Sequence, residues 1–432
     1  MTTYSTTQTM MTLAAFAATG ATPRPSGETP ADQQARIILG ITAQLALDGL
    51  ATQGNWSLVW VGLTQSGANL AYIAQGPNDG SGASVYALVL RGTVGGSPID
   101  TAEDMQVGLM LPFLGGTAGN ISQGAMEAFT DIVMGTDLVA QLKACNPGTL
   151  NVVGHSLGGA MVTTLCLYLW ASGIVEKNSI SPYTFAAPTA GDQAFATAFD
   201  TQFDWAVCTI NKYDLVPTAW ATLASIPVHF EANPFYPTVN DTPSGPGPTA
   251  NPLNPVGVLI SNIAEDNTNG NVYVQPVQQP PLNAGSTALF TPYPQGLLLS
   301  TTQQFEVQVG FQHANNTYLT LLDNAPNLPP LAPVVASVSP TSGSVSGGTS
   351  VTIYPPDGLA FSPDCVADFG IVPAPGLPQF GLNGSSMTVT SPPGVGTVDI
   401  RVTNMFGTSP AMPVYPNLTG EPYNDQFTFT AS

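Results

Sequence analysis

The sequence predicts an α/β domain with a mostly parallel central sheet, followed by an all-β sandwich domain. In the first part of the chain, apolar β-type runs alternate with helix-like runs, a pattern typical of a parallel sheet covered by helices. After the proline-rich stretch at 327–330, short runs of Val, Thr and Ser are separated by Pro-Gly and Gly-Gly turns, as in a β-sandwich. We therefore expect one domain over residues 1–326 and a second over 333–432.

The elements of the first domain can be placed in chain order. Residues 10–18 are apolar but lack the preceding Lys or Arg of a signal peptide, so we expect an amphipathic first helix. Thr29 and Pro30 fit the cap and the first position of a helix that runs to about residue 51. The other expected elements are β-type runs at 56–63, 69–74 and 84–90, a helix at 123–144, a strand and a helix joined at Ser156, a strand at 183–187, a helix at 192–203 and a strand at 205–210.

A segment rich in Pro, Asn and Gly interrupts this pattern from residue 218 to about residue 304. Long segments of this kind inside compact domains are usually functional or disordered. We expect a surface insertion, and a position as part of a cap over the functional site stays open.

The composition limits the class of protein. Charged residues make up 8% of the chain, against about 25% in average globular proteins, so uncharged polar residues supply much of the surface. Such a surface is typical of a secreted or cell-envelope protein. The formal net charge of −20 disfavours binding to nucleic acids and to anionic membranes. No apolar stretch is long enough to predict a transmembrane segment.

The four cysteines show no metal-ligand spacing. Cys166 and Cys208 lie in apolar runs and are expected to be small core residues. The cysteines leave room for at most one disulfide in the first domain. We expect neither a metal ion nor an organic cofactor.

The segment Gly154-His155-Ser156-Leu157-Gly158 carries the strongest functional signal. It follows an apolar β-type run and opens an apolar helix, which is the context of a nucleophile elbow. In such an elbow a sharp turn exposes the serine hydroxyl, and the flanking glycines avoid Cβ clashes. The N-terminal amides of the helix stabilise an anion beside the serine. A membrane span is disfavoured because Gly173 ends the helix at an ordinary globular length.

A serine nucleophile needs a base, and the chain has three histidines. His155 is the direct neighbour of Ser156, so the two side chains point apart, and we expect a structural hydrogen-bonding residue there. Both His229 and His313 fit the order serine, acid, histidine if the acid is Asp214. His229 follows that acid too closely for another sheet element to intervene, so His313 is favoured as the base.

The acid is expected at Asp214. This residue follows the apolar run that ends at Ile210, so a loop would present it at the carboxyl edge of the sheet. Asp192 and Asp204 are competitors that fit helix-start or loop positions better.

Donors for an oxyanion are expected from two segments. The run Leu88-Val89-Leu90-Arg91-Gly92-Thr93 ends a central strand where one donor is needed, and Thr93 can offer its backbone N–H and its hydroxyl. The N–H of Leu157 is expected as the other donor. A plain turn residue is the alternative for Thr93.

Several motifs of the first domain occur together. They are Arg91-Gly92-Thr93, Asp104, Gly154-His155-Ser156-Leu157-Gly158-Gly159, Phe185-Ala186-Ala187-Pro188, Asp214-Leu215-Val216-Pro217 and His313. Together they resemble the class 3, fungal-lipase-like family, over about residues 31–321, and the resemblance implies an α/β-hydrolase fold. It also implies that Ser156 is the nucleophile and Asp214 the acid. By the same resemblance His313 is the base and Thr93 the oxyanion residue.

Two departures from the family concern the shape of the acyl pocket. Thr189-Ala190 stands where the family often has Arg-Val, and the insertion at 218–304 is longer than in compact fungal members. The family's lid follows the oxyanion motif, which places it at Val94–Phe113 here. The apolar residues of that range fit a lipid-facing lid and a buried helix or strand equally well.

The second domain resembles the IPT/TIG immunoglobulin-like domain. The runs that carry this resemblance are 339–353, Asp368-Phe369-Gly370, 391–394 and 396–404, and they cover about residues 333–430. The sequence of this domain shows no aromatic platform or charge cluster that would indicate a ligand. Binding of a polymer, binding of a protein and stabilisation of the first domain therefore stay open.

The expected function is carboxylic ester hydrolysis through an acyl-enzyme. A triacylglycerol lipase that acts on a lipid or hydrophobic ester, at an oil–water interface, is the first expectation. An esterase for short-chain or phenolic, feruloyl-type esters is the alternative among enzymes. A secreted binding or adhesion protein with an inactive hydrolase domain is the alternative of another class, and the filled triad positions disfavour it.

Overall fold

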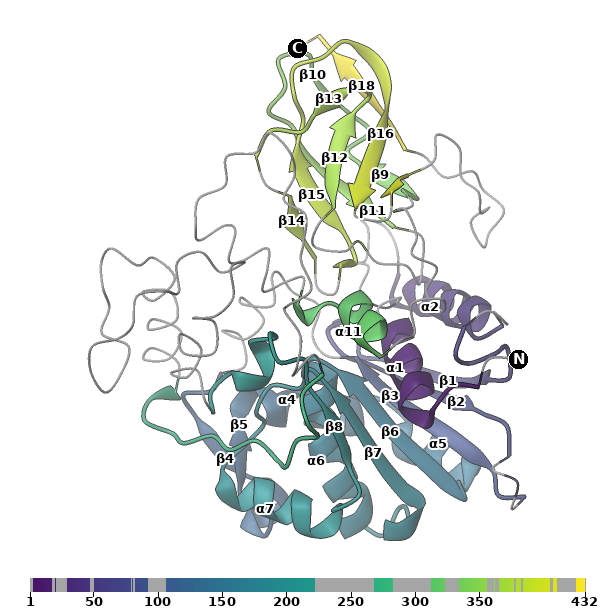
Figure 1. Cartoon of the computed structure of the whole chain (residues 1–432), viewed down its shortest axis with the longest axis vertical. Coiled ribbons are helices and arrows are strands. Elements are labelled where there is room, and N and C mark those ends of the chain that lie inside the picture. Colours follow the sequence, from purple (N-terminus) through teal and green to yellow (C-terminus); the bar gives the residue numbers. More distant parts are fainter. Residues whose placement is uncertain are drawn as a thin grey trace.

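The computed structural model of the protein describes much of the chain, with gaps (Figure 1). The described residues are 3–17, 20, 29–46, 50–78, 80, 82–91, 106–221, 268–282, 312–322, 333, 335–355, 361, 365–376, 378–381, 384–404, 407–409 and 425–431. The boundary expected between the two domains falls on residues 323–332, which lie outside these stretches.

One central sheet of six strands organises the first part of the chain. In spatial order the strands are β1 (Ser57–Leu63), β2 (Leu70–Gln75), β3 (Val85–Arg91), β6 (Thr149–His155), β7 (Ile180–Phe185) and β8 (Val207–Thr209). β2 is antiparallel to both of its neighbours, and the pairs from β3 to β8 are parallel. Only β2 therefore runs against the other strands, in agreement with the mostly parallel sheet that the sequence predicts.

Helices cover both faces of this sheet (Figure 1). On one face lie α4 (Gln123–Gly135), α5 (Leu138–Cys145), α6 (Leu157–Ala171) and α7 (Gln193–Gln202). On the other lie α1 (Thr6–Phe16), α2 (Pro30–Leu45) and α11 (Asn315–Leu321).

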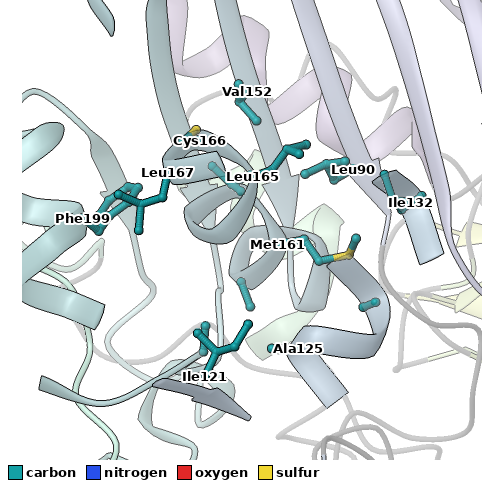
Figure 2. Packing of buried hydrophobic residues seen from close by; sticks show 14 of the residues in the cluster. Leu90, Ile121, Ala125, Ile132, Val152, Met161, Leu165, Cys166, Leu167 and Phe199 are labelled. Carbon is teal, nitrogen blue, oxygen red and sulfur yellow. The ribbon is translucent and has the colours of Figure 1, made fainter. Parts of the chain in front are cut away.

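The alternation of side chains along each strand divides the interior into two cores. On β3, Leu88 and Leu90 belong to the core on the α6 side, and Ala87 and Val89 belong to the core on the α1 side. Figure 2 shows Leu90 and Val152 of the sheet packed near Met161 and Leu165 of α6, so this face of the helix is buried. Because both faces of the parallel strands are buried, these strands appear in the sequence as nearly continuous apolar runs.

The first helix corrects the expectation of an amphipathic helix. Every residue from Met10 to Phe16 in α1 is buried. The helix packs on β3 and β6 and is contacted by α11, so its neighbours enclose it on more than one side. A helix that is apolar all round belongs in a core. Its first turn is closed by a capping box between Ser5 and Gln8.

The helix expected at 123–144 is two helices, α4 and α5, which break at Thr136. The Thr136 hydroxyl donates to the Ile132 carbonyl at 2.6 Å and accepts from the Leu138 N–H at 3.3 Å. One side chain thus satisfies backbone groups of both helix ends. Helix α2 begins at the expected proline but ends at Leu45, earlier than predicted.

Within the proline-rich region, the described stretch of residues 268–282 is named the strap. Tyr273 of the strap is buried in the core on the α6 side. Beyond edge strand β8, the Gln279 N–H donates to the Cys208 carbonyl and the Leu282 N–H donates to the Ile210 carbonyl, at 2.9 and 2.8 Å. The strap therefore covers the free edge of the sheet. Apart from Tyr273 and Pro276 the strap is half-buried or exposed, and residues 222–267 and 283–304 lie outside the described residues, so the expected surface insertion stays a prediction.

The last part of the chain forms two further sheets. One has the order β14 (Gln379–Phe380), β15 (Met387–Thr390), β11 (Ser350–Tyr354) and β9 (Ser337–Ser339). The other has the order β10 (Ser342–Ser344), β18 (Gln426–Thr430), β16 (Gly396–Asn404), β12 (Val366–Phe369) and β13 (Val372–Pro373), with β17 (Gly407–Thr408) paired to β16. Val351 of the first sheet and Val402 and Phe427 of the second belong to one hydrophobic core. The described C-terminal residues are thus β-rich, with two sheets around one core, and the all-β sandwich domain stays a prediction.

The cysteines form no disulfide: Cys145, Cys166, Cys208 and Cys365 are all free. Cys166 and Cys208 are buried, as the sequence predicts for small core residues. Within the described stretches, no helix has the length and apolarity needed to cross a membrane.

Strand β6 passes into α6 through Ser156, which has φ 58° and ψ −133°. A positive φ is strained for a residue other than glycine, so the surroundings must hold it. A Cβ on Gly154 would lie 2.3 Å from the backbone of Gly158, and a Cβ on Gly158 would lie 2.1 Å from the Leu90 carbonyl oxygen. The glycines therefore let α6 approach β3 and β6 closely, as predicted for a nucleophile elbow.

We predict that Gly158→Ala destabilises the first domain strongly. The new Cβ would meet a backbone carbonyl at 2.1 Å, which cannot move without a shift of β3. The expected loss in unfolding free energy is about 3 kcal/mol or more, measured by chemical denaturation. Gly135→Ala is the matched control, because the nearest atom to its Cβ would be a methyl group at 3.9 Å. Equal losses for the two variants would contradict the packing argument.

Candidate active site

Three residues that the sequence singles out meet at the carboxyl edge of the sheet. Ser156 follows β6, Asp214 follows β8 through a short turn, and His313 precedes α11. His313 Nε2 lies 2.8 Å from Ser156 Oγ, and His313 Nδ1 lies 2.9 Å from Asp214 Oδ2. All three residues are buried, with Ser156 6% exposed. They form one continuous chain of hydrogen bonds.

The Asp214 carboxylate is buried and surrounded by donors. Besides His313 Nδ1, it accepts from the Val216 N–H at 3.0 Å and from the Tyr318 hydroxyl at 2.8 Å. These bonds offset the cost of removing a charged group from water. Because the Asp214 carboxylate can only accept, we assign the His313 tautomer that carries its proton on Nδ1. The lone pair of His313 Nε2 then faces the Ser156 hydroxyl.

Tyr318 is a site residue that the sequence does not reveal. It is fully buried in α11, where its hydroxyl donates to Asp214 and accepts from the Asn211 N–H at 2.9 Å. Burial and the neighbouring charge of Asp214 raise the pKa of Tyr318 well above its ordinary value, so the hydroxyl keeps its proton. No motif marks this tyrosine, since its role depends on a contact across 104 positions of the chain.

His155 packs against the base. Its ring centroid lies 4.9 Å from that of His313 and 5.5 Å from that of Tyr318. No hydrogen bond of ordinary geometry reaches a ring nitrogen of His155 among the described residues, although the ring interacts with the His313 backbone. The residue is structural, as expected, and packs against His313 and Tyr318. Burial lowers the pKa of His155 well below its ordinary value, with a smaller contribution from nearby His313, so the ring is neutral at neutral pH.

The oxyanion residues are described only in part. Leu157 occupies the first position of α6, where backbone N–H groups lack partners within the helix. Thr93 lies outside the described residues, as do Asp104 and the alternative base His229. The position proposed by sequence for the second donor therefore stays a prediction.

Arg91 ends β3, two residues before Thr93 in the sequence, and is buried. Its guanidinium donates to the carbonyl groups of Gly20, Gly67 and Ala68. Burial lowers the pKa of Arg91 to about 9. The three carbonyl contacts tie the end of β3 to two neighbouring segments of the chain.

The competing acids lie at a helix start and in a turn, as expected. Asp192 caps α7 through the Phe195 N–H at 2.9 Å and accepts from the Asn120 side chain at 2.7 Å. Asp204 lies exposed in a turn.

The end of the range assigned to a lid is described from residue 106 to 113. Val107 and Phe113 are buried in the core, while Leu109 is half exposed. Between them, β4 (Met110–Pro112) pairs with β5 (Asn120–Ser122). The Tyr273 hydroxyl of the strap donates to the Val107 carbonyl at 2.7 Å. The strand β4 itself is half-buried to exposed, and residues 94–105 lie outside the described residues, so the lid and the buried-strand alternatives both stay predictions.

We predict that His155 makes stability fall in acid. In the unfolded chain His155 takes up a proton near its ordinary pKa of 6.5, whereas the folded ring stays neutral to lower pH. Stability is therefore lost as pH falls below that value, by at most about 1.4 kcal/mol per pH unit. His155→Phe should reduce the difference in unfolding free energy between pH 7 and pH 5, measured by denaturant titration. An unchanged difference in the variant would refute the assignment.

The family model described as Lipase (class 3) matches residues 87–223 of the chain. This range runs from β3 through Ser156 to the turn that contains Asp214. No curated protein matches the chain at a significant level.

The fold is similar to that of one solved lipase, and two further lipase structures match with lower scores. The structure of M37 lipase matches with a TM-score of 0.56 at 22% identity, over 76% of this chain and 94% of that one. Lip2 lipase from Yarrowia lipolytica gives a TM-score of 0.36 at 18% identity, over 48% and 72% of the two chains. Lipase II from Rhizopus niveus gives 0.35 at 17% identity, over 49% and 74%. The fold is that of a lipase-like α/β-hydrolase, and the family match over residues 87–223 supports a class 3 lipase and indicates a serine ester hydrolase.

Proposed function

We propose that Ser156, His313 and Asp214 are the catalytic triad of a carboxylic ester hydrolase. The observation that carries the proposal is the chain of hydrogen bonds from Ser156 Oγ through His313 to Asp214, at 2.8 and 2.9 Å. A base at this distance takes the hydroxyl proton as the oxygen attacks, and a carboxylate behind it stabilises the imidazolium.

The reaction proceeds in two halves. Ser156 Oγ attacks the ester carbonyl carbon while His313 Nε2 takes the hydroxyl proton. The tetrahedral intermediate then breaks its bond to the alcohol oxygen, to which His313 returns the proton. A water molecule, deprotonated by His313, attacks the acyl-enzyme, and release of the carboxylic acid restores the Ser156 hydroxyl.

The oxyanion of the intermediate would be stabilised by the Leu157 N–H and by Thr93. Leu157 supports this role because it follows Ser156 at the N-terminus of α6, where free amides face developing negative charge. Support for Thr93 comes from Arg91, whose three carbonyl contacts fix the strand end that precedes it.

The proposed substrate is a triacylglycerol or another hydrophobic ester. Leu157 and Leu215, sequence neighbours of Ser156 and Asp214, belong to the same buried cluster as Phe113 and Trp220. Because these neighbours are packed core residues, the choice of a hydrophobic ester rests on the family match and not on a described acyl pocket. The match to the lipase family agrees with this choice.

Two alternatives follow from the sequence. A short-chain or phenolic-ester esterase would use the same triad with a different acyl pocket. A binding protein with an inactive hydrolase domain is disfavoured, because the hydrogen bonds between the three side chains would have no function there.

We further propose that residues 333–432 form an IPT/TIG domain separate from a hydrolase domain over 1–326. Among the described residues, its hydrophobic core draws only on those from Val335 onward. The low content of charged residues supports an extracellular or cell-envelope location. Binding of a polymer or a protein by this domain stays a prediction from the sequence.

Ser156→Ala tests the proposed nucleophile. We expect ester hydrolysis to fall by about 10⁴- to 10⁶-fold, because no other group in the triad forms the acyl bond. Covalent labelling by a fluorophosphonate, measured by mass spectrometry, should disappear. Ser172→Ala, at the other end of α6, should keep both activity and labelling. Labelling of the Ser156→Ala variant would show that another residue is the nucleophile.

A substrate panel separates lipase from esterase. Each buried CH₂ is worth about 0.8 kcal/mol, so kcat/KM for p-nitrophenyl esters should rise by up to about fourfold per CH₂ until the pocket is filled. Turnover of triacylglycerol should increase once the substrate forms an emulsion. A preference for acetyl or feruloyl esters would instead support the esterase alternative.

A further inference from the structure

Asn211 lies in the turn between β8 and Asp214 and uses every polar atom it has. The residue is 1% exposed. Its backbone N–H donates to the Tyr318 hydroxyl at 2.9 Å, and its carbonyl accepts from the Asp214 N–H at 3.0 Å. Its side-chain Oδ1 accepts from the Tyr213 N–H at 3.3 Å. Its Nδ2 donates to the Gln312 carbonyl at 3.1 Å and to Gln312 Oε1 at 2.7 Å.

These bonds join the side of the site that carries the acid to the side that carries the base. The two bonds from Nδ2 span 101 positions of the chain and end on Gln312, the residue directly before His313. One of them holds the peptide carbonyl itself, so it constrains the backbone from which the base projects. The backbone atoms of Asn211 shape the acid turn, and its amide links that turn to the base.

We propose that Asn211 is a positioning residue of the triad, whose side-chain amide sets the distance between the Gln312–His313 peptide and the acid turn. The inference rests on the proposed function, because it assigns a role within that triad. Asn211 acts through His313 and has no contact with the reacting atoms. Its effect is on the reach of His313 Nε2 to Ser156 Oγ, which is 2.8 Å in the structure.

The expected effect is on turnover. Proton transfer needs a heavy-atom distance of about 2.6–3.2 Å, and a displacement of about 1 Å can cost about 100-fold in rate. Asn211→Ala removes both bonds to Gln312 and the longer bond from the Tyr213 N–H, but keeps the backbone bonds to Tyr318 and Asp214. We therefore expect kcat to fall by about 10- to 100-fold with KM within about twofold.

The matched control is Asn151→Ala. Asn151 is also buried, and its Nδ2 donates to the Tyr86 carbonyl at 3.3 Å within the sheet. Both variants should lower the thermal midpoint, because each leaves a buried carbonyl without its donor. Only Asn211→Ala should lower kcat, and only it should slow labelling of Ser156 by a fluorophosphonate.

Gln312→Ala tests the Asn211–Gln312 hydrogen bonds by changing the acceptor residue. It serves as the test of positioning if Asn211→Ala does not fold. It removes the 2.7 Å bond to Oε1 and keeps the bond to the carbonyl, so a smaller fall in kcat is expected. A folded Asn211→Ala with wild-type kcat and a lowered midpoint would overturn the inference. Wild-type kcat in a Gln312→Ala variant, with Asn211→Ala unfolded, would overturn it too.

Failure of the inference is distinguishable from failure of the proposed function. If the wild-type chain hydrolyses no ester, or if Ser156→Ala retains activity, the proposed function fails whatever the Asn211 variants do. If the wild type is active and Ser156→Ala is inactive, the ratio of kcat between the Asn211 and Asn151 variants tests positioning alone.

Discussion

The buried carboxylate of Asp214 is the constraint on which the functional half of the first domain depends. A charge that is removed from water is stable only when donors surround it. Asp214 takes its donors from the turn in which it lies and from the segment around α11, through Val216, His313 and Tyr318. Satisfying the charge therefore brings α11 back onto the sheet. The same contacts that compensate this carboxylate place His313 beside Ser156.

Steric packing holds the nucleophile Ser156 in place. Ser156 keeps a positive φ because Gly154 and Gly158 let α6 pack against strand backbone at distances that no Cβ would permit. Its position is therefore determined by steric contact, whereas that of His313 is determined by hydrogen bonds. The site thus combines a rigid nucleophile with a hydrogen-bonded acid and base, and the side-chain bonds from Asn211 to Gln312 hold that acid and base together.

The sequence predicts the parts of the site that local geometry determines. Ser156 is visible because an elbow requires glycines at fixed spacing between a strand and a helix, and Asp214 because it follows an apolar strand. Tyr318 and Asn211 are not visible, since their roles depend on contacts across about a hundred positions. The burial of α1 is missed for the same reason: an apolar run does not tell which partners enclose it.

The strap fixes one part of the long proline-rich region directly against the turn that carries the acid. Leu282 pairs with the acid turn from the far side: its N–H donates to the Ile210 carbonyl, and its carbonyl accepts from the Lys212 N–H at 3.1 Å. The peptide around Asn211 is thus held between the strap and the base segment. Because the cost of closing a loop grows only slowly with its length, residues between such fixed points can vary in number at little cost to the site.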